Sequence, residues 1–118
     1  MILLRSNEFK IIKDSLPLGV NLLAVSKGHD HESIRKLSGY GQLDFGESRL
    51  QEAIPKKIDL NDLKEIRWHF VGALQKNKVR RVIKEFDFIH SVDSLPLLER
   101  ISRISQEEQK SPNIFLQV

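Results

Sequence analysis

Short apolar stretches alternate with amphipathic segments along this chain. Five of the stretches have the length and the β-branched or aromatic content of buried strands, and they span residues 20–26, 43–46, 65–72, 86–92 and 113–118. Between them, apolar residues recur at spacings of three and four, which predicts helices that bury one face. The pattern therefore predicts an α/β fold in which helices join parallel strands.

The expected helices have defined faces and ends. Their apolar faces are Phe9, Ile12 and Leu16; Ile34 and Leu37; Leu50, Ala53 and Ile54; Val79, Val82, Ile83 and Phe86; and Leu95, Leu98 and Ile101. Asp30, and either Asp93 or Ser94, are predicted N-caps. The third helix is predicted to start around Glu47 and to break or kink at Pro55, because proline lacks the N–H that a helix interior needs.

Two architectures accommodate this order of elements. An open, doubly wound sheet is one, but the chain contains neither a G-x-G-x-x-G turn nor a P-loop to support a nucleotide-binding version of it. The other is part of a barrel, with the last apolar strand as an edge. We favour the second: a partial (β/α)8 TIM barrel, with about five of its eight parallel strands and their covering helices.

Composition indicates a globular protein. Of the 118 residues, 40% are hydrophobic and 30% charged, and none is cysteine, which excludes disulfides and cysteine-bound metal. Charges at Arg5 and Glu8 come too early for a signal peptide, and no apolar run approaches the roughly 20 residues of a membrane span. We therefore expect a cytoplasmic protein with no membrane partner.

The net charge of +3 is concentrated in one segment, whose cations are Lys76, Lys78, Arg80, Arg81 and Lys84. The apolar face of the same helix places these charges on its solvated side. A nucleic-acid-binding helix remains an alternative, but no aromatic residues are interleaved with the charges to stack on bases. The sequence therefore does not favour a nucleic-acid partner.

Functional groups of a (β/α)8 barrel lie at the carboxyl ends of its strands. Here those positions are Ser26 and Lys27; Gly46, Glu47 and Ser48; Gly72; and Ser91, Val92 and Asp93. Lys27 follows the apolar run 22–26 directly. A lysine at the edge of a core can lose part of its hydration and act as an amine nucleophile on an aldehyde. Local sequence alone leaves open the ordinary alternative, a lysine that points into water.

Two histidines, His69 and His90, lie within the third and fourth expected strands. In one register they face the barrel interior and line a polar pocket, and in the other they pack against the covering helices. The chain has no H-x-x-H or H-E-x-x-H spacing, so we expect no metal site.

Four motifs together carry a family resemblance. They are Leu-Ala-Val-Ser-Lys at 23–27, Asp-Phe-Gly-Glu-Ser-Arg-Leu-Gln-Glu at 44–52, Trp-His-Phe-Val-Gly-Ala-Leu-Gln-Lys-Asn-Lys at 68–78, and His-Ser-Val-Asp-Ser at 90–94. In order and spacing, over nearly the whole chain, they resemble the signatures of the YggS/PROSC family of pyridoxal-phosphate-binding proteins, which is built like the barrel domain of alanine racemase.

The resemblance implies a monomeric protein that serves vitamin B6 homeostasis and has no firmly established reaction. Residues 1–118 would form the N-terminal part of a single barrel domain, with its C-terminal strands missing. Pyridoxal 5′-phosphate would be held as a Schiff base on Lys27. The other expected cofactor-binding residues are Ser26, Gly46, Ser48, His69, His90 and Ser91. The family most often has Asn in place of Ser48 and a bulkier residue, Pro or His in place of Ala73.

The resemblance also limits what this chain can do. In such barrels the cofactor's phosphate is held by loops after the last two strands, so we expect these 118 residues to bind the cofactor weakly or not at all. A pyridoxal-phosphate-dependent amino-acid racemase is the alternative function, and it would need a second base. The one tyrosine, Tyr40, stands beside Gly39 and Gly41 in an expected helix-ending turn, which favours a structural role.

Overall fold

The computed structural model describes residues 6–118, so the early charge at Arg5 lies outside the described residues. The elements are α1 (Ser6–Ser15), β1 (Ala24–Val25), α2 (His31–Gly39), β2 (Asp44–Glu47), α3 (Leu50–Asp59), β3 (Arg67–Phe70), the short 3-10 helix η1 (Lys76–Lys78), α4 (Val79–Glu85), β4 (Phe88–Val92), α5 (Leu95–Glu108) and β5 (Asn113–Leu116). Strands and helices alternate from β1 to β5, as the hydrophobic pattern predicts.

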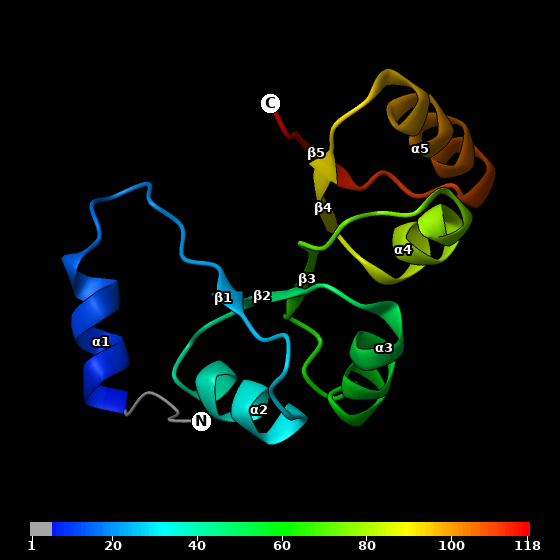
Figure 1. Cartoon of the computed structure of the whole chain (residues 1–118). Coiled ribbons are helices and arrows are strands. Elements are labelled where there is room, and N and C mark those ends of the chain that lie inside the picture. Colours follow the sequence, from blue (N-terminus) through cyan, green and yellow to red (C-terminus); the bar gives the residue numbers. More distant parts are fainter. Residues whose placement is uncertain (1–5) are drawn as a thin grey trace.

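The five strands form one parallel sheet in the order β1-β2-β3-β4-β5. A doubly wound sheet reverses its strand order at a switch point, and this sheet has no reversal. Figure 1 shows α2 to α5 along one side of the row of strands, with α1 standing apart from them. Sequential order with helices on one side is the arrangement of a barrel wall, so the predicted partial (β/α)8 barrel is confirmed.

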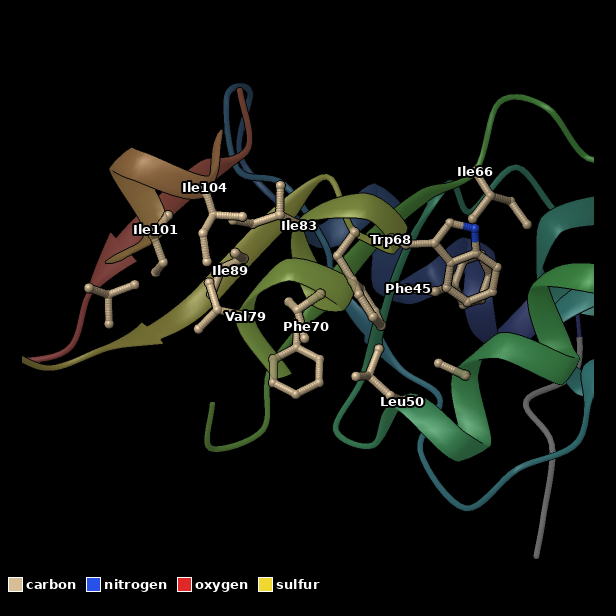
Figure 2. Close-up of a cluster of buried hydrophobic side chains, with 14 of the residues drawn as sticks. Phe45, Leu50, Ile66, Trp68, Phe70, Val79, Ile83, Ile89, Ile101 and Ile104 are labelled. Atoms are coloured by element: carbon tan, nitrogen blue, oxygen red, sulfur yellow. The ribbon is translucent and has the colours of Figure 1, made fainter. Parts of the chain in front are cut away.

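The hydrophobic core lies between the sheet and these helices. Alternate strand residues, among them Phe45, Trp68 and Phe70, point into it (Figure 2). Helix α4 contributes a face that is wholly buried and that the sequence predicts in full: Val79, Val82 and Ile83, followed by Phe86. Since β2, β3 and β4 each bury one face in this way, their opposite face is left for the site.

Two of the predicted helix caps are confirmed. The carboxylate of Asp30 accepts a hydrogen bond of 3.0 Å from the backbone N–H of Ser33 at the start of α2. Of the two candidates before α5, it is Ser94 that caps, because its hydroxyl accepts from the backbone N–H of Leu97 at 3.3 Å. Such side chains satisfy N–H groups that have no partner within the helix.

The strands are shorter than predicted. The apolar run 20–26 contains only two strand residues, Ala24 and Val25, and Val25 is 51% exposed. In the described sheet β1 pairs with β2 alone, so backbone hydrogen bonds hold it on one side. The run 65–72 likewise narrows to Arg67–Phe70 and the run 86–92 to Phe88–Val92.

Three helix predictions are wrong in detail. Helix α3 starts at Leu50, since Glu47 belongs to β2 and is fully buried, and α3 continues through Pro55 to Asp59. In α5 the buried residues are Leu97, Ile101 and Ile104, whereas Leu95, at the first position, is 64% exposed. In α1 only Phe9 of the predicted face is buried, because α1 stands away from the sheet (Figure 1). No described helix is long and apolar enough to cross a membrane.

Strand β5 lies at the edge of the described sheet. It pairs with β4 alone, and all four of its residues are exposed, including Ile114, Phe115 and Leu116. An apolar strand with one side unpaired is the edge that the sequence predicts for an incomplete barrel wall.

The basic segment around α4 is largely neutralised by neighbouring acids. The Arg80 guanidinium forms ion pairs with Glu107 and Glu108 at the end of α5, and it holds the pKa of both carboxyls below their ordinary values. Lys84 lies 3.5 Å from Glu108. These contacts place much of the charge between two helices of this chain, so less of it is free for a polyanion than the sequence suggests.

Candidate functional site

The loops at the carboxyl ends of β1, β2 and β3 form one edge of the sheet. The β1 strand ends in a turn of Ser26, Lys27 and Gly28, where Gly28 adopts a φ of +80°, a backbone conformation that favours glycine. Ser26 is buried, and its backbone N–H donates to the Gly46 carbonyl of β2 at 2.8 Å. The structure thus brings together two of the predicted site residues, Ser26 and Gly46.

Lys27 is exposed, contrary to the expectation that it sits at the edge of the core. The buried position is that of Ser26, and the turn that follows carries Lys27 into solvent. Within residues 6–118 its side chain forms no hydrogen bond or ion pair. An exposed, unpaired amine is accessible to an aldehyde, although it has not lost the hydration that the sequence argument invokes.

A buried ion pair that the sequence did not predict lies beneath this turn. Glu47 is fully buried, and the ammonium group of Lys56 on α3 lies 2.9 and 3.0 Å from its two carboxylate oxygens. The same ammonium donates to the Ser26 carbonyl at 3.0 Å and to Glu52 at 3.0 Å. Charged residues are rarely this buried unless they are paired, and here the partners are nine residues apart and on different elements.

Glu52 extends the network to the far side of Lys27. Its carboxylate accepts a hydrogen bond from the backbone N–H of Gly28. That N–H, together with the Lys56 ammonium, holds the pKa of Glu52 below its ordinary value. Glu52 is therefore an anion over the neutral range.

The loop after β2 touches the loop after β3 backbone to backbone. A Cβ atom placed on Gly72 would lie 2.3 Å from the carbonyl oxygen of Ser48, so only glycine fits there. Beside this contact is a hollow of about 260 Å³, lined by Ser48, Arg49, Leu50, Phe70, Gln75 and Lys78 among others. Lys27 does not line it, so the structure does not join Ser48 to Lys27 in one described cavity.

His69 and His90 lie on the sheet face opposite the helices, which is the register that faces a barrel interior. His69 Nδ1 lies 2.9 Å from His90 Nε2, and His69 Nε2 lies 2.9 Å from the carboxylate of Asp44. Arg67 pairs with the same carboxylate at 2.7 Å and lowers the pKa of Asp44 below its usual range. The ionised Asp44 can only accept, so His69 Nε2–H donates a hydrogen bond to it, and His69 Nδ1 then accepts one from His90.

Aromatic rings enclose this histidine pair. The Phe88 ring stacks on His69 with centroids 4.0 Å apart, and the Phe115 ring stacks on His90 at 4.4 Å. Burial, and secondarily the neighbouring His69, lower the pKa of His90 below its ordinary value. His90 is consequently a neutral donor at pH 7.

We expect the histidine pair to make the protein less stable in mild acid. Because the pKa of His90 is depressed in the folded state, the unfolded chain binds more protons below pH of about 6.5, and stability falls as the pH drops through that value. A His90→Gln variant should lose part of this fall when urea midpoints are compared at pH of about 7.5 and 5.5. His29→Gln is the control, and an unchanged pH dependence in His90→Gln would contradict the prediction.

Ser91 is the last predicted site residue, and it lies in β4. Its hydroxyl oxygen is buried and has no hydrogen-bond partner among the described residues. Buried polar groups in proteins are nearly always satisfied, so an unpartnered hydroxyl next to a candidate site is available to a ligand. In the described part of the chain, no group of three or more His, Asp or Glu is placed to hold a metal ion.

Curated proteins are similar to most of this chain. No family model matches the chain. A protein of a Synechocystis species is 44% identical over 104 residues, covering 88% of this chain and 48% of the relative. A protein of Pseudomonas aeruginosa is 41% identical over 102 residues, covering 86% of this chain and 44% of the relative. Both are named pyridoxal phosphate homeostasis protein.

Over most of its length the chain is therefore similar to proteins named pyridoxal phosphate homeostasis protein. It spans about half the length of the curated relatives it matches. Among solved structures, PipY of Synechococcus elongatus with PLP bound matches with a TM-score of 0.93 and 46% identity, covering 96% of this chain and 53% of PipY. A CdALR mutant matches at a TM-score of 0.69 and 16% identity, over 90% of this chain and 28% of CdALR, which shows the shared fold alone.

These similarities confirm the resemblance drawn from the four motifs. Three residues next to those predicted for the site were missed by sequence reasoning: Glu47 as a buried anion, Glu52 and Lys56. Glu47 and Glu52 stand inside the second motif, and Lys56 follows it on the same helix. The i, i+4 spacing of Glu52 and Lys56 was a usable signal for their pairing.

Proposed function

We propose that this chain carries the cofactor-attaching lysine of a pyridoxal phosphate homeostasis protein, and that this lysine is Lys27. The observation that carries the proposal is the contrast between two lysines at one edge of the sheet. Lys56 is buried and engaged by acceptors from Ser26, Glu47 and Glu52, whereas Lys27 is exposed and unpaired among the described residues. Of these two lysines, Lys27 is the one whose amine is free to react.

The residues predicted for the site suit pyridoxal phosphate. The cofactor supplies an aldehyde, with which an amine forms a carbon–nitrogen double bond, a Schiff base, as one water molecule leaves. Ser91 offers a buried hydroxyl without a partner, and His90 offers a neutral ring on the inner face of the sheet. Gly46, beside Ser26, leaves room for the Val71 side chain, which a Cβ at this position would meet at 3.2 Å. These groups would hold and orient the cofactor, together with Ser26, Ser48 and His69.

We further propose that residues 1–118 are the N-terminal part of one barrel domain in a cytoplasmic, monomeric protein. Coverage of about half of the relatives' length supports the first point, and the absence of cysteine is compatible with the second. Barrels of this kind hold phosphate at loops after their last strands, beyond the five described here. On that basis, these 118 residues bind the cofactor weakly.

A role without catalysis fits the described residues better than a racemase does. A racemase needs a second base across the cofactor from the lysine. Tyr40 follows α2, which runs back from the carboxyl edge of the sheet, so it lies at the opposite edge from Lys27. Its ring packs near Phe9, with centroids 6.0 Å apart, as a structural residue does.

The Lys27→Ala variant tests this proposal. The protein is incubated with pyridoxal 5′-phosphate, reduced with borohydride, digested, and mapped by mass spectrometry. We expect the modified peptide to contain Lys27 in excess over the exposed lysines Lys36 and Lys64, and we expect that peptide to disappear in Lys27→Ala but not in Lys36→Ala. Modification of Lys27 no greater than that of Lys36 would contradict the proposal. Exchange of the α-proton of alanine that is lost in Lys27→Ala would instead favour the enzyme.

A further inference from the structure

We propose that Glu52 and Lys56 together fix the backbone on both sides of Lys27, and that Glu52 is the positioning residue for the side that follows it. The inference rests on the proposed function, because it assigns the role of neighbours to the lysine named there. It adds to that function the groups outside the cofactor pocket that determine where the Lys27 amine points. None of these groups needs to touch the cofactor.

The residue before Lys27 is held from below. The backbone N–H of Ser26 donates to the Gly46 carbonyl at 2.8 Å, and its hydroxyl donates to the buried carboxylate of Glu47. The Ser26 carbonyl accepts from the Lys56 ammonium at 3.0 Å and from the His29 backbone N–H at 3.1 Å. With these four bonds, Ser26 has no freedom to turn the peptide that leads into Lys27.

The residue after Lys27 is held by a single side chain. The Gly28 N–H donates to Glu52, and Glu52 is itself fixed by the Lys56 ammonium at 3.0 Å. Lys56 therefore contacts both arms of the turn, directly at Ser26 and through Glu52 at Gly28. A lysine side chain has four rotatable bonds, so a fixed backbone removes the largest part of the uncertainty in where its amine points.

Glu52 is the member of the network on which the proposal can be tested without unfolding the protein. Its side chain is 29% exposed, whereas Glu47 is fully buried and Lys56 nearly so. Truncating Glu52 removes the bond to Gly28 and leaves the pair of Glu47 and Lys56 in place. Glu52→Gln is the conservative variant, because its carbonyl oxygen can still accept from Gly28.

The experiment measures two quantities in the wild type, Glu52→Ala, Glu52→Gln and the control Asp62→Ala. Asp62 forms an exposed ion pair with Arg35 at 2.8 Å, away from the turn. The first quantity is the rate of pyridoxal 5′-phosphate attachment to Lys27, trapped by borohydride and normalised to Lys36. The second is hydrogen exchange of the peptide that contains Gly28. We expect Glu52→Ala to slow attachment about tenfold and to speed exchange, with Glu52→Gln and Asp62→Ala close to the wild type.

The outcomes separate the two proposals. If the wild type shows no preferential attachment at Lys27, the proposed function fails and the positioning role fails with it. If the wild type is modified at Lys27 and Glu52→Ala is modified at the same rate, the positioning role alone is overturned. A loss in Glu52→Ala that Glu52→Gln does not restore would also overturn it, because the hydrogen bond to Gly28 would then not be the cause.

Discussion

Replacing Lys56 with methionine is expected to lower the free energy of unfolding by about 3 to 5 kcal/mol, because it leaves the Glu47 carboxylate buried without its counter-charge. Glu47 has no exposed surface, and the Lys56 ammonium contacts both of its oxygens. In the same change the Ser26 carbonyl loses one of its two donors and keeps the His29 N–H. Urea unfolding, read as the shift in midpoint at constant slope, measures the loss.

The double variant Glu47→Leu/Lys56→Met measures the net contribution of the ion pair to stability, apart from the cost of leaving one charge buried alone. Removing both charges removes the desolvation penalty along with the attraction, and apolar replacements of buried pairs are often neutral or stabilising. We expect the double variant to recover most of the loss. If Lys56→Met alone costs less than about 1 kcal/mol, the prediction is wrong and the pair of Glu47 and Lys56 contributes no more than a surface ion pair does.

Truncating Phe86 to alanine is expected to cost about 3 to 5 kcal/mol of unfolding free energy, the usual range for a large aromatic residue in a core. The ring is fully buried, and it packs edge-on against Phe70, with centroids 5.1 Å apart. The Lys57 ammonium lies 5.9 Å from the same ring. No neighbour can fill the space without leaving its own contacts, so a cavity remains. Thermal and urea unfolding both report the loss.

Phe115→Ala is the matched control, since it deletes the same ring from a different place. Phe115 lies on the edge strand β5 and is 48% exposed, although it stacks on His90. We expect its removal to cost less than half as much as Phe86→Ala, because less apolar surface returns to water. Equal losses in the two variants would mean that β5 is as well covered in solution as the centre of the core.

Much of the fold could be predicted because its signals are local. Asp30 and Ser94 cap helices within three residues of themselves, and the buried face of α4 repeats at helical spacing. The wrong predictions come from residues whose partners are distant. From the sequence, Glu47 is a typical residue for a first helical turn. Its buried position in a strand becomes clear only from its pairing with Lys56, which the sequence does not show. The length of β1 depends on how many strands flank it, which its own residues do not encode.

The candidate site was predicted in its parts rather than in its arrangement. The motifs predict Lys27. For His69 and His90 the sequence leaves two registers open, because the choice between them depends on strand pairing and not on the histidines themselves. The exposure of Lys27 was not predictable from an apolar run that ends next to it, because the chain turns one residue earlier than the hydrophobicity suggests.

The close contact of Gly72 with Ser48 determines how this edge of the sheet can respond to a ligand. Besides the glycine contact, the Val71 N–H donates to the Glu47 carbonyl at 2.9 Å, so the chain segments leaving β2 and β3 are joined where they emerge. Two segments joined in this way move together or not at all. Recognition at this part of the edge therefore works by selecting molecules that fit a wall already formed, and adaptation has to come from the flexible side chain of Lys27.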